Sequence, residues 1–363
     1  MALLDLQYEQ KLFTKLGDFN GDNKRDFLWR NTVTGENTMW LMNGTSIAAS
    51  ANLPGLATNW DVDAIGDFNG DGKSDIFWRN FQTGDSTMWQ MNGTSIAASV
   101  NLPGLATNWD IEVIGDFNGD GKSDILWHNF KTGENTMWQM NGTSIAAAAN
   151  LPTLSTNWDI EVIGDFNGDG KTDILWRNFQ TGENTVWQMN GTSIAASANL
   201  PTLSQSWFAY ADGDFNSDGK TDILWRNYQT GANTVWQMNG TSIAASANLP
   251  TLSTNWSPAA EGDYSGDGKT DIIWHNSATG ENVMWLMNGT AITGSTALPA
   301  LDKNWSLSSA TDYNGDGKSD VFLHNNATGA NAIWQMDGAT ITAAVNLPAL
   351  STNWETRNSV AVG

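Results

Sequence analysis

The chain has 363 residues, a formal net charge of −22, 20 tryptophans and no cysteine. Without cysteine the chain can form neither disulfides nor thiol-based sites, and its acidity makes nucleic acid and anionic membrane surfaces poor partners. The length suffices for a large core and is compatible with one all-β domain.

The first residues, Met1 to Lys11, lack the basic and apolar regions of a signal peptide. No apolar stretch approaches the ~18 residues of a membrane span. We therefore expect a soluble protein without membrane insertion, and secretion stays open because the chain could be a fragment. The segment Lys11 to Leu16 could supply a first inner strand.

A phrase of the type GDFNGDGKSD returns every 49 residues, without one insertion. Such a period indicates a repeat architecture and covers nearly the whole chain, so we treat residues 1–363 as a single domain. The first aspartates of the seven copies are Asp18, Asp67, Asp116, Asp165, Asp214, Asp263 and Asp312.

Each repeat predicts four short strands, illustrated by the second copy. Strands are expected at 60–66, 76–80, 86–91 and 94–102, with a polar loop over 67–75. Thr83-Gly84 marks a turn, and Asn92-Gly93 is a strong hairpin signal. The second and third strands are apolar on both faces, so sheets must stack on sheets.

Four-stranded units at this period, stacked radially, predict an all-β, seven-bladed propeller of antiparallel blades. A linear β-solenoid is the alternative, although its coils are usually shorter. How the ring closes stays open, because Trp354 to Val362 resembles an eighth copy of the first strand and would compete with Lys11 to Leu16 for one place.

The polar loop carries oxygen-bearing side chains at its positions 1, 3, 5 and 9, a pattern that can wrap a hard cation such as Ca²⁺. An EF-hand is excluded, because its position 12 needs glutamate and the second copy has Trp78 there. The alternatives are a solvated turn rich in Asp and Asn, and Mg²⁺, which prefers water-rich octahedral sites. The predicted side-chain ligands are Asp18, Asn20, Asp22, Asp26, Asp67, Asn69, Asp71, Asp75, Asp116, Asn118, Asp120, Asp124, Asp165, Asn167, Asp169, Asp173, Asp214, Asn216, Asp218, Asp222, Asp263, Ser265, Asp267, Asp271, Asp312, Asn314, Asp316 and Asp320.

Position 7 of each loop can add a backbone carbonyl. The sites of the first and sixth copies are expected to be weakest, because Asn23 replaces a loop glycine and Ser265 replaces asparagine. The predicted backbone ligands are Lys24, Lys73, Lys122, Lys171, Lys220, Lys269 and Lys318.

The motif GDFNGDGKSD over 66–75, followed by IFWRN, resembles the FG-GAP/VCBS repeat family across residues 17–347. That family includes the integrin α-subunit propeller and propeller lectins. The resemblance implies calcium on the loop between the first and second strands, and a function in binding rather than catalysis. It does not specify a ligand.

Three shorter motifs are weak. GDGKS lacks the glycine spacing of a phosphate-binding P-loop, and GTSIA lacks the last glycine of a nucleophile elbow. Asn43-Gly44-Thr45 is formally a glycosylation sequon, but a hairpin turn explains it better.

One slot after the second-strand tryptophan always holds a planar nitrogen donor followed by asparagine. The structural explanation is an ion pair with acids such as Asp63, Glu112 and Glu161, or bonds to backbone carbonyls. The functional explanation is ligand binding. The slot holds Arg30, Arg79, His128, Arg177, Arg226, His275 and His324, followed by Asn31, Asn80, Asn129, Asn178, Asn227, Asn276 and Asn325.

A tryptophan begins each predicted first strand, at the end opposite the aspartate loops and on the side of the donor slot. Its ring could stack on a sugar while planar donors bind the hydroxyls. Packing between blades is the structural alternative. These residues are Trp60, Trp109, Trp158, Trp207, Trp256, Trp305 and Trp354.

Three functions remain. The first is a calcium-binding, multivalent glycan-binding module, since repeated weak sites gain avidity. The second is a protein-interaction or adhesion scaffold without a glycan ligand. The third, an enzyme, is disfavoured because catalysis needs one asymmetric site. Weak calcium sites favour an extracellular or cell-surface setting, with the cytoplasm as the alternative. We also expect a bacterial protein.

Overall fold

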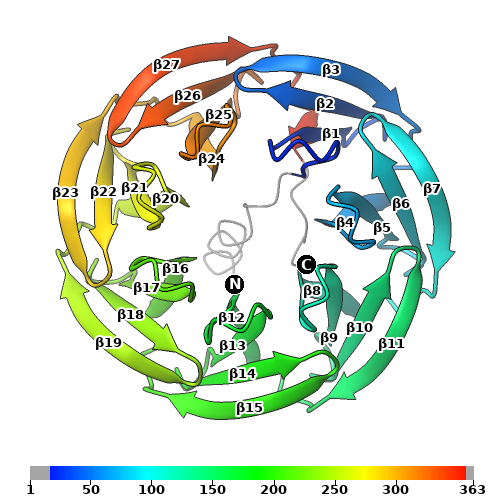
Figure 1. Cartoon of the computed structure of the whole chain (residues 1–363), viewed down its shortest axis with the longest axis horizontal. Coiled ribbons are helices and arrows are strands. Elements are labelled where there is room, and N and C mark those ends of the chain that lie inside the picture. Colours follow the sequence, from blue (N-terminus) through cyan, green and yellow to red (C-terminus); the bar gives the residue numbers. More distant parts are fainter. Residues whose placement is uncertain (1–16, 357–363) are drawn as a thin grey trace.

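The computed structural model describes residues 17–356, except the side chains of residues 308–310, 355 and 356. Seven four-stranded antiparallel sheets stand around a common axis as the blades of a propeller (Figure 1). Blade 1 has the strand order β28-β1-β2-β3, and blades 2 to 7 follow in sequence order from β4 to β27. The predicted all-β, seven-bladed architecture is therefore confirmed.

Each blade contributes one strand to each of four concentric positions. The innermost strands are β4 (Trp60–Gly66), β8 (Trp109–Gly115), β12 (Trp158–Gly164), β16 (Trp207–Gly213), β20 (Trp256–Gly262), β24 (Trp305–Thr311) and β28 (Trp354–Thr356). The second strands are β1 (Phe27–Asn31), β5 (Asp75–Asn80), β9 (Asp124–Asn129), β13 (Asp173–Asn178), β17 (Asp222–Asn227), β21 (Asp271–Asn276) and β25 (Asp320–Asn325).

The two outer positions complete each blade. The third strands are β2 (Asn37–Asn43), β6 (Ser86–Asn92), β10 (Asn135–Asn141), β14 (Asn184–Asn190), β18 (Asn233–Asn239), β22 (Asn282–Asn288) and β26 (Asn331–Asp337). The outermost strands are β3 (Ser46–Leu53), β7 (Ser95–Leu102), β11 (Ser144–Leu151), β15 (Ser193–Leu200), β19 (Ser242–Leu249), β23 (Ala291–Leu298) and β27 (Thr340–Leu347).

The core lies between the blades, as the two-faced apolar pattern requires. Every residue of β5 is buried, whereas the outermost strand β7 is mostly open to solvent. One core cluster joins Phe19 and Leu28 of blade 1 to Ile76, Trp78 and Trp89 of blade 2. Trp78 is completely buried, and removing so large a ring from water contributes about 4 to 6 kcal/mol of transfer free energy.

The ring is closed by the C-terminal strand. In β28, Trp354 and Thr356 pair with Asn31 and Trp29 of β1, so the last strand among the described residues completes the first blade. This answers the question of which segment fills the inner position of that blade. The competing candidate, Lys11 to Leu16, and the end of the predicted strand, residues 357–362, lie outside the described residues.

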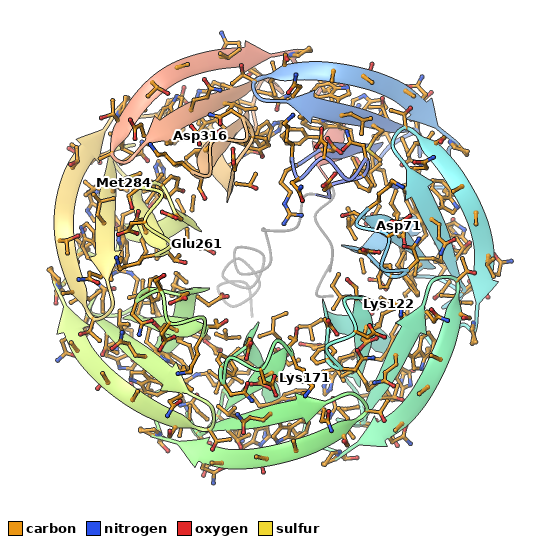
Figure 2. The ribbon with its side chains drawn as sticks, in the orientation of Figure 1. Asp71, Lys122, Lys171, Glu261, Met284 and Asp316 are labelled. Atoms are coloured by element: carbon orange, nitrogen blue, oxygen red, sulfur yellow. The ribbon has the colours of Figure 1, made fainter. Side chains whose placement is uncertain are left out.

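The strand register defines two faces of the ring. Pairing of Gly66 with Asp75 and of Trp60 with Asn80 places the aspartate loop and the β5–β6 turn at opposite ends of the blade. We call them the aspartate face and the turn face, and the connection from each blade to the next runs along the turn face. Side chains of the aspartate loops, such as Asp71, lie around the inner part of the ring (Figure 2). None of the described residues forms a helix able to cross a membrane.

Candidate functional site

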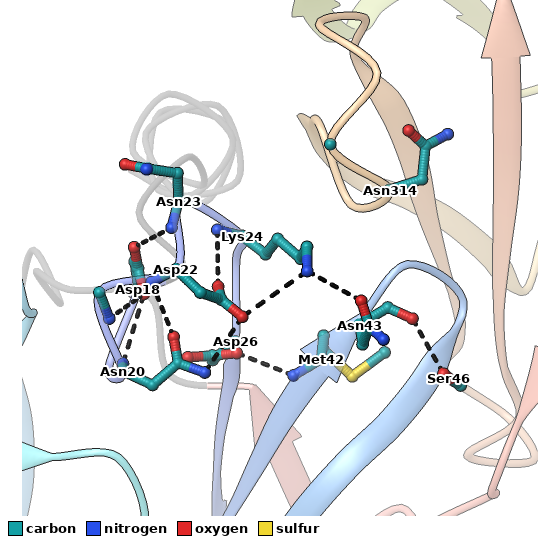
Figure 3. Close-up of polar contacts among 12 residues, drawn as sticks. Asp18, Asn20, Asp22, Asn23, Lys24, Asp26, Met42, Asn43, Ser46 and Asn314 are labelled. Atoms are coloured by element: carbon teal, nitrogen blue, oxygen red, sulfur yellow. Dashed lines mark hydrogen bonds and ion pairs between the residues drawn. The ribbon is translucent and has the colours of Figure 1, made fainter.

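The aspartate loops fold around the side chains of their own acidic residues. In blade 1, the Asp18 carboxylate accepts a hydrogen bond from the amide of Asn23 at 2.7 Å (Figure 3). Asn20 Oδ1 accepts from the amide of Asp22 at 2.9 Å, and Asp22 Oδ1 accepts from the amide of Lys24 at 3.0 Å. The alternating oxygen positions thus determine the loop conformation directly.

The ninth loop position holds a buried carboxylate. Asp75 is completely buried, and its Oδ1 accepts a 2.9 Å bond from the amide of Met91. Burial raises the pKa of Asp75 to about 7, the Met91 bond opposes this, and the charges of Asp67 and Asp71 raise it further. The other oxygen, Oδ2, is buried without a hydrogen bond of normal geometry in Asp75, Asp124, Asp222 and Asp271, although the amide of Phe68 still lowers the pKa of Asp75.

In the other three blades this second oxygen does have a partner, the amide of the second loop residue. The donors and acceptors are Phe19 and Asp26, Phe166 and Asp173, and Tyr313 and Asp320. A buried carboxylate oxygen without a donor is costly, and a bound cation would relieve that cost.

The donor set fits calcium in its chemistry: each loop offers carboxylate, amide and backbone oxygens, which hard cations prefer. In blades 1 to 6 the fifth-position aspartate is paired with the loop lysine, as in the 3.5 Å contact between Asp71 and Lys73, whereas in blade 7 the lysine pairs with Asp337. No three carboxylate or imidazole groups among the described residues are arranged to hold a metal ion. Calcium binding by the predicted side-chain and lysine-carbonyl ligands therefore stays a prediction.

The departures from the loop pattern have visible effects. Asn23 replaces glycine and takes a positive φ of 62°, which asparagine tolerates better than most residues. Ser265 reaches Asp263 only at 3.5 Å. A third departure escaped the sequence analysis: Ser217 replaces the glycine found at loop position 4 and also has a φ of 62°.

Each aspartate loop is attached to the following blade. The carbonyl of Asp18 accepts a 2.6 Å bond from the amide of Ser74, and the carbonyl of Phe19 accepts a 2.7 Å bond from the amide of Gly93. Equivalent pairs recur around the ring, for example between Asp67 and Ser123. The loops therefore lie at the joints between blades, where a bound metal would act on ring stability.

The predicted planar-donor slot is bonded within the protein, and its residue is buried in blades 1 to 5 and half-buried in blades 6 and 7. In blade 5, Arg226 Nη1 donates to Gly231 O at 3.0 Å and to Asn233 Oδ1 at 2.9 Å. Nη2 donates to Ser253 O at 2.8 Å, and the guanidinium lies 5.1 Å from the ring centre of Trp274 in blade 6. Backbone carbonyls, one of the structural alternatives, thus provide its main partners.

The same geometry explains why histidine can replace arginine. His128 Nδ1 lies 2.7 Å from Asn135 Oδ1, an asparagine at the start of the third strand. His275 and His324 make the equivalent contact at 2.8 and 2.7 Å. What the position requires is a planar group that can bond to this asparagine.

Blade 2 breaks this rule, because serine replaces the asparagine. Arg79 Nη1 and Ser86 Oγ are both buried without a hydrogen-bond partner. Arg79 still donates to Ala106 O at 3.0 Å and lies 4.8 Å from the ring centre of Trp127. The slot arginine of blade 2 consequently lacks the asparagine hydrogen bond that the other blades have.

The asparagine after the slot forms a turn. Asn80 Oδ1 accepts from the amides of Gln82 and Thr83 at 3.0 and 3.2 Å, which holds the β5–β6 turn. This asparagine is buried in all seven blades. The arginines, histidines and asparagines of the predicted ligand set thus make hydrogen bonds within the protein. A ligand role for them stays a prediction.

The tryptophans that begin the inner strands have a mixed environment. Trp60 packs against the cluster that joins blades 1 and 2, yet it is only half-buried, as are its six equivalents. All seven lie on the turn face, where the register pairs Trp60 with Asn80. They pack between blades and still offer part of a ring to solvent.

Acids on the inner strands connect blades. The Glu161 carboxylate accepts a bond from the amide of Ala209 in the next blade. Asp63 holds the position in blade 2 that Glu161 holds in blade 4, but its side chain is one methylene shorter. It is 8 % exposed, and its Oδ2 has no hydrogen bond. Burial raises the pKa of Asp63 to about 7, while Arg79 opposes the shift.

Sequence reasoning missed a column of exposed aromatics one residue after the turn asparagine. Phe81 is 56 % exposed and Phe130 48 % exposed, although both are large and apolar. Alignment of the seven repeats contains the signal, because the same position holds Phe179 and Tyr228 but is Thr32 in blade 1, Ser277 in blade 6 and Asn326 in blade 7.

Three solved structures illustrate the similarity to known folds. A crystal structure of a nidogen/laminin complex matches with 13 % identity, a TM-score of 0.41, and coverage of 74 % of this chain and 92 % of that one. The Cps50 (Swd1) β-propeller domain of Myceliophteria thermophila has 9 % identity, a TM-score of 0.48, and coverage of 93 % and 97 %. Kluyveromyces lactis Hsv2 has 9 % identity, a TM-score of 0.49, and coverage of 93 % and 98 %.

No curated protein matches the chain. The profile of the FG-GAP-like repeat, in contrast, matches five overlapping segments: residues 18–78, 67–127, 116–176, 214–274 and 263–323. Each match runs from one aspartate loop to the second strand of the next blade, which is the unit that the interblade bonds join. The matches cover more than half of the sequence, and the chain belongs to the FG-GAP-like repeat family.

Proposed function

We propose that the chain is a non-catalytic interaction scaffold whose ring is stabilised by calcium in the seven aspartate loops. The buried carboxylate at loop position 9 carries this proposal. Its second oxygen lacks a hydrogen bond of normal geometry in four blades, and two further aspartates of the same loop add like charge. A divalent cation would satisfy the oxygen and neutralise the repulsion.

Calcium should act mainly on stability, because the loops join neighbouring blades. With a dissociation constant of ~1 mM, typical of extracellular modules, ~10 mM Ca²⁺ stabilises the fold by about 1.4 kcal/mol per site. Such weak sites fill only where calcium is millimolar, so we place the working environment outside the cell.

Thermal unfolding tests this proposal directly. The melting temperature should rise by several degrees in 10 mM Ca²⁺ over chelator, and 10 mM Mg²⁺ should have a much smaller effect. Asp71→Ala removes one exposed loop carboxylate and should reduce the calcium shift, while Asp85→Ala in the distant turn leaves it unchanged. Equal melting temperatures in calcium and chelator would contradict the proposal.

Carbohydrate binding is the second candidate, supported by the half-exposed tryptophans that recur on the turn face. An aromatic ring can stack on the apolar face of a sugar, but the arginines of the slot are bonded within the protein. A glycan array in calcium, repeated with Trp60→Ala, tests this candidate. Selective retention that weakens in the variant supports a lectin, and no retention favours a protein partner.

A further inference from the structure

The exposed apolar side chains gather in one turn of consecutive blades. Val33 of blade 1 is 65 % exposed, and Phe81, Phe130 and Tyr228 of blades 2, 3 and 5 are 56, 48 and 38 % exposed. Phe179 supplies the half-buried equivalent in blade 4. Blade 1 has Thr32 at the aromatic position and contributes the next residue, Val33, and blades 6 and 7 have polar residues there, so the patch covers one side of the turn face.

A buried ring joins the aromatic side chains of blades 4 and 5. The Phe208 ring stacks on Phe179 with a centroid distance of 6.0 Å and an interplanar angle of 27°. Its other neighbour is Tyr228, with a centroid distance of 5.8 Å. Phe208 takes the place that an aspartate holds in blades 2 to 4, beside the half-exposed tryptophan that begins the strand. Phe208, from β16, is itself only 5 % exposed, so its buried ring supports the Phe179 and Tyr228 rings of two neighbouring turns from below.

Carboxylates share the turn face with these rings, and the face offers few exposed cations to balance them. In the described part of the chain, the lysines outside the aspartate loops are Lys131 and Lys303, and the slot arginines are buried. The carboxylates of the β-turns and inner-strand starts on this face are Glu36, Asp61, Asp85, Asp110, Glu134, Asp159, Glu183 and Glu281.

From this arrangement we infer that the turn face over blades 1 to 5 binds a basic segment of a protein partner, rich in arginine and lysine. Aromatic faces attract cations, and neighbouring carboxylates add charge-assisted bonds. The fold already uses this chemistry where Arg226 lies 5.1 Å from the centre of the Trp274 ring. The inference depends on the proposed scaffold function and identifies its partner class.

The chain supplies its own replacements for the test. Blade 6 has serine at the aromatic position and blades 5 and 7 have Ala232 and Ala330 at the acidic turn position, so these residues fit the turn. The probe is a short fluorescent peptide of alternating arginine and glycine, measured by anisotropy in calcium. The test variants are the triple change Phe81→Ser, Phe130→Ser and Tyr228→Ser, and the single change Glu134→Ala.

Two control variants separate surface recognition from bulk charge. Asp337→Asn removes one carboxylate from the aspartate face, at a position that is asparagine in the other six blades. Val100→Ser removes an exposed apolar side chain from the outermost strand β7. We expect the triple variant to bind at least about tenfold more weakly, Glu134→Ala to bind more weakly, and both controls to bind like the unaltered protein.

Unchanged binding by the triple variant would overturn the inference, as would equal losses in Glu134→Ala and Asp337→Asn. Failure of the unaltered protein to bind the peptide would also overturn it. The scaffold proposal is judged separately, by calcium-dependent melting and by retention on the glycan array. A protein stabilised by calcium that binds sugars but not the basic peptide would refute only the partner class.

Discussion

The amide of Leu154 donates a 3.0 Å hydrogen bond to the carbonyl oxygen of Gly133, joining the exit connection of blade 3 to its β9–β10 turn. Gly133 has a φ of 73°, and a Cβ on it would lie 1.7 Å from the carbonyl oxygen of Leu154. The same contact is made at Gly35, Gly84, Gly182, Gly231, Gly280 and Gly329. The glycine of the Thr-Gly turn is thus required for the path of the chain between blades.

Gly133→Ala should therefore destabilise the protein strongly. Gly121 of the same blade has a φ of 80° and no atom within 4 Å of a Cβ, so Gly121→Ala measures the backbone strain alone, of about 1 to 2 kcal/mol. We expect Gly133→Ala to exceed that cost by at least about 2 kcal/mol in urea unfolding, because a backbone carbonyl must move. Equal losses in the two variants would show that the Leu154 contact imposes no constraint.

The buried polar atoms of Arg79 and Ser86 that lack hydrogen bonds in blade 2 predict a stabilising substitution. Ser86 pairs with Arg79 in the register, as Asn37 does with Arg30. Ser86→Asn should give the buried Arg79 Nη1 an acceptor and raise the free energy of unfolding by about 1 kcal/mol.

The reverse change, Asn37→Ser, removes an acceptor at 3.0 Å from Arg30 Nη1 and should destabilise the protein by a similar amount. Differential scanning calorimetry of both variants measures the effect. A lower melting temperature for Ser86→Asn would refute this account of the joint.

Much of the fold could be predicted because the same strand and loop pattern recurs in all seven repeats. Binary patterning located strands such as Trp60–Gly66, and burial on both faces of Ile76 to Trp78 required blades stacked on blades. Alternating oxygens predicted how Asp67 organises its loop. These features depend on residues close together in the sequence.

The contacts of the planar-donor slot could not be predicted in the same way. Arg30 donates to carbonyl oxygens of Leu56 and Ala57, 26 and 27 residues later, and backbone carbonyls leave no trace in side-chain identity. Closure by β28 rather than by an earlier segment depends on which of two similar strands pairs with β1. The exposed aromatic surface was missed because a Phe after a turn asparagine looks like core until its exposure is known.

Substitutions of Arg226 distinguish a structural role from a ligand role. Arg226→His should cost about 1 kcal/mol, because histidine keeps the bond to Asn233 as His128 does to Asn135. Arg226→Ala should cost about 3 kcal/mol, since it leaves buried acceptors unpaired. Chemical denaturation gives both values. If neither variant changes stability but both abolish ligand binding, the slot is a binding site.

The buried Asp63 predicts a pH dependence. Its pKa is raised from 3.8 to about 7 by burial, with Asp110 and Asp61 adding repulsion and Arg79 opposing the shift. A raised carboxyl pKa means that the folded protein holds this proton more tightly than the unfolded chain. The contribution of Asp63 to the free energy of unfolding is therefore most favourable below about pH 4. It falls as the pH rises from about 4 to 7 and does not change further above about pH 7.

Asp63→Asn removes the titrating carboxyl and with it this pH-dependent contribution to the free energy of unfolding. Relative to the unaltered protein, the variant should gain stability across that pH window, by at most about 4 kcal/mol at about 1.4 kcal/mol per pKa unit. Asp85→Asn, in an exposed turn of the same blade, controls for the loss of one charge. The measurement is urea unfolding between pH 4 and 8, and a difference between variant and unaltered protein that does not change with pH would refute the prediction.

Closure of the ring by β28 can be tested by removing it. Truncation before Trp354 deletes the partner of β1 and the indole that packs against the cluster joining blades 7 and 1. The exposed edge of β1 would then have unpaired backbone groups, which favours association between chains. We expect a lower melting temperature and concentration-dependent oligomers in size-exclusion chromatography, and recovery when a peptide of residues 350–363 is added. A truncated chain that melts like the full one would show that β28 is dispensable for closure.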